Sequence, residues 1–265
     1  MVVAKHVVVE PDAVTSLGAA GTEVKAREDA SSRGPCQREP SLSAVVLCGG
    51  QSSRMGRDKA ALPLGTCSLL ERAASLLAEI TPDVRLACGA EPRYAQLNLP
   101  LVLDRVSDAG PLGGLEAALA SASPGLVIAI ACDMPRLDAR ALRALVDFAR
   151  TDDLDVAMLR SESGLEPLCA VWSTRVAGAV RAALDAGRFK MTSVFDVLLP
   201  DGSKPRVGTL TVDELLAGDV STTESAARAA SALVGNVNTP EDYARELELH
   251  ADLPAHVTRG AKARR

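Results

Sequence analysis

Aromatic side chains are scarce in this sequence: phenylalanine, tyrosine and tryptophan together make up 2% of its 265 residues. Proteins that bind single-stranded nucleic acid use aromatic rings as platforms on which the bases stack. The chain also lacks an excess of positive charge, because its formal net charge is −5. Proteins that bind duplex nucleic acid or membrane surfaces carry a basic face. We therefore expect no nucleic-acid partner and no membrane partner.

Histidine is rare, and cysteine pairs of the zinc-binding type are missing. The three histidines, His6, His250 and His256, lie near the two ends, and none of the six cysteines forms a C-x-x-C pair. A structural zinc site needs four clustered ligands, so this pattern excludes one. Most of the cysteines lie in or beside apolar, strand-like runs, where a thiol usually packs as a small hydrophobic group.

Long hydrophobic runs are also missing. No apolar stretch approaches the ~20 residues that a membrane-spanning helix needs. The valine run within residues 1–14 is too short for a signal-peptide core, and an acidic residue and a proline follow it. We therefore expect a cytoplasmic protein, whose 47% hydrophobic residues suffice for one sizeable domain.

The chain divides into three parts by composition. Residues 1–42 mix glycine, serine, proline and charge without sustained periodicity, and we interpret them as a disordered extension. Residues 43–249 carry periodic apolar patterns and form the predicted domain. Residues 250–265 are a basic tail.

The predicted domain alternates between strand-like and helical patterns. Continuous apolar runs at residues 43–47 and 125–133 predict buried strands, and helical spacing at residues 68–80 and 138–150 predicts amphipathic helices. Continuously apolar strands separated by helices are typical of a parallel sheet covered on both faces. The sequence therefore predicts an α/β fold.

The stretch LCGGQSSRMGRDK, residues 47–59, follows the first predicted strand. Its paired glycines allow backbone N–H groups to approach phosphate oxygens, and Arg54, Arg57 and Lys59 supply positive charge for a polyphosphate. The stretch is neither a P-loop nor a G-x-G-x-x-G motif. A flexible turn with a solvated basic edge explains the same residues, and this stretch alone leaves both interpretations open.

Two carboxylates also follow predicted strands, where open parallel sheets bind their ligands. Asp133 ends the most apolar run, and such a residue suits a hard cation such as Mg²⁺. The alternative role, capping the next helix, is already filled by Asp138. Asp104 precedes a Gly-Pro-Leu-Gly-Gly turn, for which an ordinary tight turn with solvated acids is the alternative.

Four stretches together resemble the bacterial molybdenum cofactor guanylyltransferases, which belong to the sugar-nucleotide type of nucleotidyltransferases. They are AVVLCGGQSSRMGRDKAALPLG, DAGPLGGLEAAL, ACDMP and NVNTPEDY, in this order within residues 43–248. The resemblance implies a Rossmann-like, doubly wound, mostly parallel sheet. It also implies the transfer of GMP from GTP to the molybdenum–molybdopterin cofactor with Mg²⁺, with release of pyrophosphate. Proteins that deliver or accept the molybdenum cofactor are the implied protein partners.

The resemblance also implies roles for individual residues. Lys59 and Arg54 would hold phosphates during catalysis, and Asp133 would bind both the nucleotide and Mg²⁺. Asn238, or alternatively Asn236, would complete the metal site. The implied nucleotide-binding residues are Leu47, Cys48, Gly49, Gly50, Lys59, Asp104 and Asp133.

The sequence departs from the family pattern at a few positions. Cys48 replaces the alanine of the usual LAGG, Gly65-Thr66-Cys67 replaces a frequent Gly-Lys-Pro, and Ala87-Cys88-Gly89 stands where some members have an asparagine. Because these positions border the predicted site, two other functions stay open. One is cytidylyl or sugar-phosphate nucleotidyl transfer on the same fold, and the other is nucleotide binding without catalysis.

Overall fold

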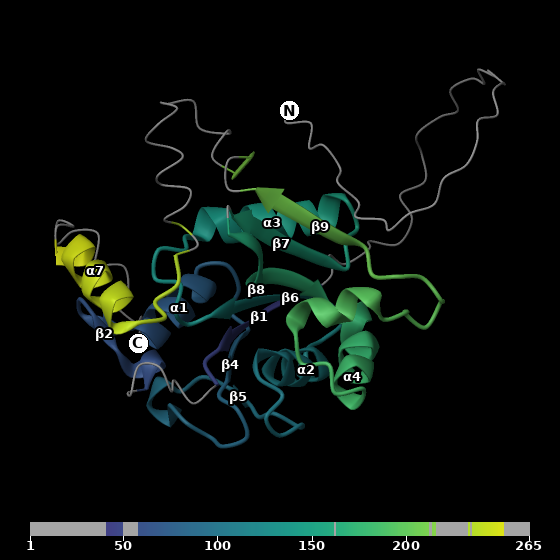
Figure 1. The fold of residues 1–265 in the computed structure, drawn as a ribbon, viewed down its shortest axis with the longest axis horizontal. Coiled ribbons are helices and arrows are strands. Elements are labelled where there is room, and N and C mark those ends of the chain that lie inside the picture. The colour runs from purple at the N-terminus through teal and green to yellow at the C-terminus, as the bar shows by residue number, and fades with distance from the viewer. Residues whose placement is uncertain are drawn as a thin grey trace.

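A seven-stranded sheet forms the centre of the protein in the computed structural model, which describes residues 41–49, 58–161, 163–211, 214–215, 233 and 235–251. The order of the strands across the sheet is β5-β4-β1-β6-β8-β7-β9 (Figure 1). The strands are β1 (Ser41–Leu47), β4 (Val84–Ala87), β5 (Leu101–Val102), β6 (Gly125–Ala131), β7 (Val156–Ser161), β8 (Gly164–Ser173) and β9 (Val207–Thr211).

The sheet is mostly parallel, as predicted. β1 pairs in parallel with both β4 and β6, so that Leu47 lies opposite Ala87 on one side and Ala131 on the other. The chain builds outward from β1 through β4 and β5 and then returns to place β6 on the other side of β1. This reversal makes the carboxyl ends of β1 and β6 the topological switch point of the sheet.

β8 is the exception, because it runs antiparallel to both of its neighbours, β6 and β7. Its pairing with β7 is interrupted between the pairs Met158–Ala170 and Leu159–Glu166. Pro167, Leu168 and Cys169 fall between these two pairs on the β8 side and form a bulge. A proline suits this place because it has no N–H to donate to the ladder.

Helices cover both faces of the sheet (Figure 1). α1 (Leu69–Ala78) and α3 (Ala139–Thr151) pack into one apolar cluster, and α2 (Pro111–Ser121) and α4 (Ala177–Asp185) pack into the other. Each cluster contains alternate residues of β1, because successive side chains of a strand point to opposite faces. The doubly wound α/β fold is confirmed.

Local sequence signals set several helix ends. Asp138 accepts a hydrogen bond from the Ala141 N–H at 2.8 Å and caps α3, as predicted. The segment after Ser173 forms a short 3-10 turn, η3 (Thr174–Val176), before α4 begins. The segment after Lys190 also forms a 3-10 helix, η4 (Met191–Asp196).

α7 (Pro240–Ala251) packs beside a small hairpin of β2 (Pro63–Leu64) and β3 (Cys67–Ser68). The Tyr243 hydroxyl donates to the Pro63 carbonyl, and an ion pair of 2.8 Å joins Arg136 to Glu246. These contacts fix the chain that enters α7.

The ordered elements run slightly beyond the predicted domain of residues 43–249. β1 begins at Ser41, because Ser41 already pairs with Gly125, and α7 ends at Ala251. The predicted extension before Ser41 and the predicted tail after Ala251 lie outside the described residues.

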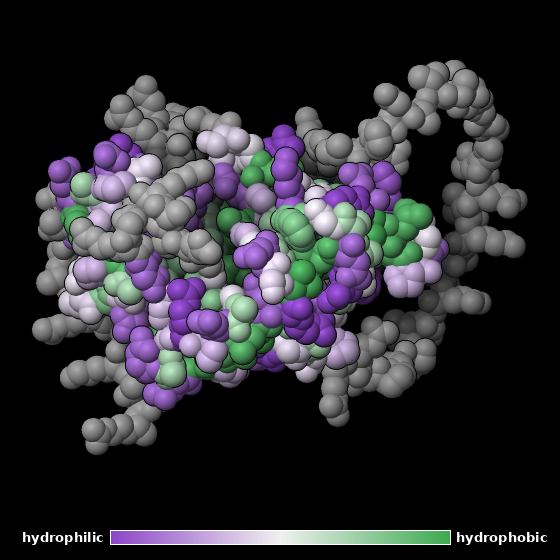
Figure 2. Space-filling view, turned by 60° about the horizontal axis from the view of Figure 1, so that its bottom comes forward, coloured by the Kyte–Doolittle hydropathy of each residue, from purple (hydrophilic) through white to green (hydrophobic). Residues whose placement is uncertain are grey.

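Figure 2 shows one face of the molecule, on which hydrophilic residues separate small groups of hydrophobic ones and a hollow near the centre has apolar residues in its depth. The most exposed large hydrophobic side chains of the described chain include Leu198 and Phe189. Within the described residues, no helix combines the length and the hydrophobicity that crossing a membrane requires.

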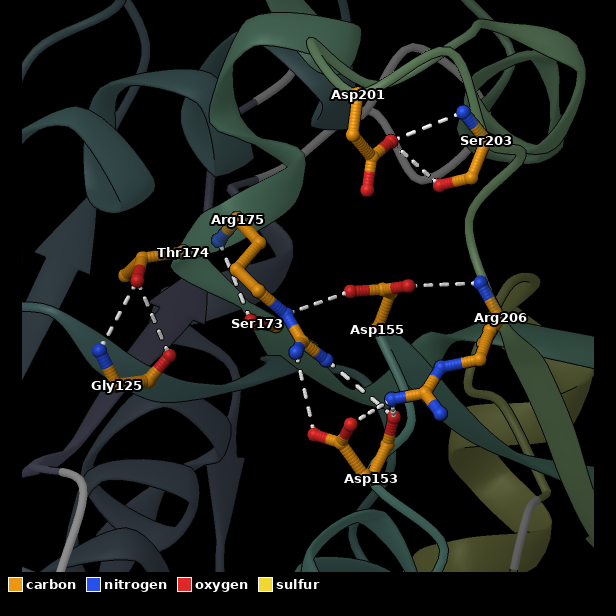
Figure 3. A network of polar contacts seen from close by, with 9 residues as sticks. All are labelled: Gly125, Asp153, Asp155, Ser173, Thr174, Arg175, Asp201, Ser203 and Arg206. Carbon is orange, nitrogen blue, oxygen red and sulfur yellow. Dashed lines mark hydrogen bonds and ion pairs between the residues drawn. The ribbon is translucent and has the colours of Figure 1, made fainter.

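A network of charged side chains joins neighbouring segments at the end of the sheet that lies opposite to the switch point (Figure 3). One Asp155 carboxylate oxygen accepts from the backbone N–H of Arg206 at 2.8 Å, and the other lies 2.9 Å from Nε of Arg175. Both arginines also contact Asp153. Asp155 is almost fully buried at the start of β7, so it ties η3 and the start of β9 to that strand.

Replacing this buried carboxylate should destabilise the fold. Asp155→Ala leaves the Arg206 N–H without its acceptor and removes the anion that faces Arg175, so we expect the free energy of unfolding to fall by about 2 kcal/mol. Urea denaturation followed by circular dichroism measures it. Asp201→Ala is the control, because the Asp201 carboxylate is exposed and accepts hydrogen bonds from Ser203 within its own turn. Equal losses in the two variants would contradict the role of Asp155.

Candidate active site

The candidate site lies at the switch point, where the loops after β1 and β6 run side by side. The Cys48 N–H donates to the Ala87 carbonyl at 2.9 Å, and the Cys132 N–H donates to the Leu47 carbonyl at 3.4 Å. These bonds continue the sheet pairing by one residue beyond the strands. They hold the two loops at the mouth of the sheet, where ligands of such folds bind.

A cavity of about 240 Å³ opens at this place. Its lining combines backbone from the ends of β1, β4 and β6 with the first turn of α2 and one residue of the β8 bulge, Leu168. The predicted site residues that line it are Leu47, Cys48, Gly49, Lys59, Asp104 and Asp133. The structure therefore brings these residues together. Gly50 and Arg54 lie outside the described residues.

Lys59 is held between two oxygen atoms at one end of the cavity. Its Nζ lies 2.8 Å from Oδ2 of Asp133 and 2.9 Å from Oδ1 of Asn238. The side chains of Lys59 and Asp133 are only 16% and 14% exposed, so their charges interact in a partly desolvated environment. Lys59 opens the 3-10 turn η1 (Lys59–Ala61), which Asp58 caps by accepting from the Ala60 N–H.

The chain before α7 reaches the site through a backbone contact. The Val237 N–H donates to the Asp133 carbonyl at 2.9 Å, which places the following residue, Asn238, beside Lys59. Thr239 then caps α7 by accepting from the Asp242 N–H at 3.1 Å. Of the two asparagines considered from the sequence, Asn238 is the one that hydrogen-bonds to Lys59.

The Asp133 carboxylate is suited to a cation. Its Oδ1 is buried and has no hydrogen-bond partner, while Oδ2 accepts from Lys59. An orphaned carboxylate oxygen is costly unless a ligand uses it. Among the described residues, no three His, Cys, Asp or Glu side chains cluster around a possible metal. A cation here would therefore combine Asp133 with oxygen atoms of Asn238 and of a bound phosphate, as Mg²⁺ does.

Asp104 presents a second unpaired carboxylate oxygen on the opposite wall. Its N–H donates to the Gly89 carbonyl at 2.9 Å, and its carboxylate lies against the first turn of α2. A Cβ on Gly113 would meet Oδ2 at 3.0 Å, so a glycine is needed for this approach. Burial, together with repulsion from Glu116, raises the pKa of Asp104. The buried Oδ1 has no hydrogen-bond partner in the protein and is available to accept a hydrogen bond.

Sequence reasoning missed Arg93, which stabilises the loops from outside the cavity. Its guanidinium donates to the carbonyls of Cys48 and Cys88 at 3.3 and 3.1 Å and so bridges the chain after β1 and after β4. The neighbouring Tyr94 hydroxyl bonds the carboxylate of Asp58, the residue that caps η1. An arginine in a predicted loop carries no motif, so only the folded structure identifies this contact.

The sheet order and the cavity at the switch point are those of a Rossmann-like α/β fold. The family model for the MobA-like NTP transferase domain matches residues 44–198, and the chain belongs to this family. The fold class and the family inferred from the sequence are thereby confirmed.

Curated relatives and a solved structure agree with this assignment. The chain is 33% identical over 208 residues to a probable molybdenum cofactor guanylyltransferase of Carboxydothermus hydrogenoformans, covering 78% of this chain and 96% of the relative. It is 34% identical to the molybdenum cofactor guanylyltransferase of Pseudomonas fluorescens, covering 66% and 91%. The structure of molybdopterin-guanine dinucleotide biosynthesis protein A from Archaeoglobus fulgidus has a similar fold, with a TM-score of 0.64, 21% identity, and coverage of 80% and 100%.

The loop after β1 tolerates no side chain at its first glycine. A Cβ on Gly49 would lie 2.9 Å from the backbone nitrogen of Gly89 and 3.2 Å from the Cys88 carbonyl carbon, and backbone atoms cannot rotate away. We expect Gly49→Ala to lower the free energy of unfolding by about 1–3 kcal/mol, measured by urea denaturation.

The matched control is Gly178→Ala. Gly178 lies in α4, and a Cβ there would meet nothing within 4 Å. Alanine is a better helix former than glycine, so this variant should be as stable as the parent protein or slightly more stable. A Gly49→Ala protein of unchanged stability would show that the two loops are not closely packed.

Proposed function

We propose that this protein transfers GMP from GTP to the molybdenum–molybdopterin cofactor, forming the guanine dinucleotide cofactor and releasing pyrophosphate. The observation that carries the proposal is the cluster of Lys59, Asp133 and Asn238 at the mouth of a cavity in a fold of this family. Two relatives that the chain matches over more than nine-tenths of their length are named for this reaction.

The nucleotide occupies the cavity in this proposal. Backbone N–H groups after β1, starting with Gly49, face its phosphates, and Lys59 supplies the positive charge beside them. Asp104 accepts a hydrogen bond from a donor on the nucleoside, using its otherwise unpaired Oδ1. Gly50 and Arg54 extend the phosphate contacts in this proposal, as the sequence predicts.

Asp133 and Asn238 hold Mg²⁺ in this proposal. The buried, unpartnered Oδ1 of Asp133 supports this assignment, because a carboxylate oxygen with no protein donor is available to a hard cation. When bound, Mg²⁺ neutralises phosphate charge and thereby lowers the repulsion between two anionic reactants.

The reaction needs positioning rather than a protein nucleophile. A phosphate oxygen of the acceptor forms a bond to the α-phosphorus of GTP while the bond to the β-phosphate oxygen breaks and pyrophosphate leaves. Lys59 stabilises the charge that grows on the leaving group, and Asp133 and Asn238 hold Lys59 in place for this role. Because the side chains of this pair are only 14–16% exposed, their electrostatic interactions are stronger than in bulk water.

A cytidylyl or sugar-phosphate nucleotidyltransferase is the second candidate, since such enzymes share the fold. The paired glycines at residues 49–50 resemble the GTP users, whereas cytidylyl relatives more often carry Ala-Ala-Gly. We further propose that the enzyme works in the cytoplasm, with proteins that deliver or accept the molybdenum cofactor as partners.

A comparison of the four nucleoside triphosphates tests this function. Each is offered to the protein with Mg²⁺ and molybdenum–molybdopterin cofactor, and pyrophosphate release is measured. We expect release with GTP to exceed release with the other nucleotides at least tenfold. Preferential use of CTP would establish the second candidate, and tight nucleotide binding without any release would indicate a non-catalytic protein.

Asp133→Asn tests the proposed centre. The change is nearly isosteric but removes the negative charge, so steady-state pyrophosphate release should fall by a factor of about 100 or more. GTP affinity should fall less, because the backbone contacts do not depend on that charge and Asn238 still accepts a hydrogen bond from Lys59. Raising the Mg²⁺ concentration should restore part of the rate.

Asp138→Asn is the matched control for this variant. It makes the same change five residues further along, where asparagine caps a helix as well as aspartate does. It should keep both the rate and the melting temperature. A folded Asp133→Asn protein with normal turnover at limiting Mg²⁺ would remove Asp133 from the mechanism.

A further inference from the structure

Two cysteines lie side by side at the edge of the candidate site. The sulfur atoms of Cys48 and Cys88 are 3.6 Å apart, and both residues are buried. They directly follow Leu47 and Ala87, which pair in register across the parallel strands β1 and β4. The neighbouring strands of a sheet run about 4.8 Å apart, which lies within the separation of about 4.4–6.8 Å between Cα atoms that a disulfide needs.

The cavity lets a small oxidant approach this pair on the side of Cys48, which is one of the residues that line it, and the Cys88 sulfur lies 3.6 Å from the Cys48 sulfur. Cys132 also lines the cavity, but the sulfur–sulfur contact of the described chain is the one between Cys48 and Cys88. Cys169 is fully buried in β8, and Cys67 lies half-buried in β3, where its sulfur contacts the Leu64 carbonyl.

The two thiols differ in their tendency to lose a proton. The hydrogen bond between the two sulfurs lowers the pKa of Cys88 to about 7, and the Arg93 guanidinium acts in the same direction. The same sulfur contact and burial raise the pKa of Cys48. A thiolate beside a protonated thiol is the arrangement in which one sulfur attacks an oxidant and the other resolves the product.

We propose that Cys48 and Cys88 form a redox-modification site, at which a hydroperoxide converts the two thiols into a disulfide. The Cys88 sulfur attacks one peroxide oxygen, the O–O bond breaks, and the first water leaves. The Cys48 sulfur then attacks the resulting sulfenic acid, an S–S bond forms as the S–O bond breaks, and the second water leaves. Two thiols and one hydrogen peroxide thus give one disulfide and two waters.

This modification regulates the nucleotide site, an inference that rests on the proposed function. The two sulfurs must approach each other by about 1.5 Å to reach the bonded distance. Cys48 would then leave its hydrogen bond to the Ala87 carbonyl and shift the wall of the cavity. Gly49 follows at once and lies so close to the next loop that an added Cβ would be 2.9 Å from the Gly89 backbone nitrogen, so the loop has little room to absorb the movement. Oxidation therefore weakens nucleotide binding.

The test uses the full chain in its reduced form and after treatment with hydrogen peroxide in the presence of a chelator. Peptide mass spectrometry without reduction should show the Cys48 peptide linked to the Cys88 peptide. After removal of the oxidant and addition of Mg²⁺, calorimetric titration should show GTP affinity at least tenfold weaker than that of the reduced protein. Dithiothreitol should restore it.

Two variants separate this site from general oxidation. Cys88→Ser keeps a small polar group beside the Arg93 carbonyl, and it should bind GTP like the parent protein before and after peroxide. Cys67→Ser removes the thiol in β3 and should remain as sensitive as the parent. If Cys88→Ser does not fold, Cys48→Ala replaces it, and its own affinities before and after peroxide are compared.

The outcomes distinguish this inference from the proposed function. Peroxide treatment that leaves Cys48 and Cys88 unlinked overturns the redox site, and a link that changes GTP affinity less than twofold overturns the regulation. A reduced protein that binds no GTP overturns the proposed function and the regulation with it. In that case the mapped link still decides whether the disulfide forms.

Discussion

The ion pair between Lys59 and Asp133 is the contact on which the site depends, because it joins three distant segments. Lys59 comes from the turn after β1, Asp133 follows β6, and Asn238, the other acceptor of Lys59, precedes α7. A pair that is only 14–16% exposed costs desolvation energy and contributes little net stability. It holds charges in place before a ligand arrives, which lowers the reorganisation needed in a transition state. The cap at Asp58, the Val237 backbone contact and the anchoring of α7 all serve to hold this pair.

At the opposite wall, glycines allow neighbouring segments to pack closely. Gly113 lets the Asp104 carboxylate reach the first turn of α2, and Gly114 lies where a Cβ would meet the Cβ of Ala87 at 2.9 Å. Gly49 likewise allows the loop after β1 to pack closely against the loop after β4. The Lys59–Asp133 ion pair therefore bounds the cavity at one end, and the closely packed backbone around Gly113 and Gly114 bounds it at the other. Such a site offers a polar, charged ligand both backbone groups and side chains as partners.

The strand ends and the family resemblance predict that Lys59, Asp104 and Asp133 lie at one edge of the sheet, and the structure brings them into one cavity. The antiparallel direction of β8 could not be predicted, because its apolar run looks the same in either direction when both faces are buried. The contact between Cys48 and Cys88 depends on the register of β1 against β4, which no local pattern encodes. Arg93 bridges two carbonyls that become neighbours only after the sheet has formed.

The bulge in β8 brings Leu168 into the cavity wall. Side chains alternate between the faces of a strand, so the number of residues in the bulge decides which of them points toward the ligand. The pairs on either side of the bulge remain anchored to β7, so a change in its length is confined to this short segment. Insertion or deletion at the bulge would therefore alter this part of the cavity wall without changing Lys59 and Asp133, which come from other segments.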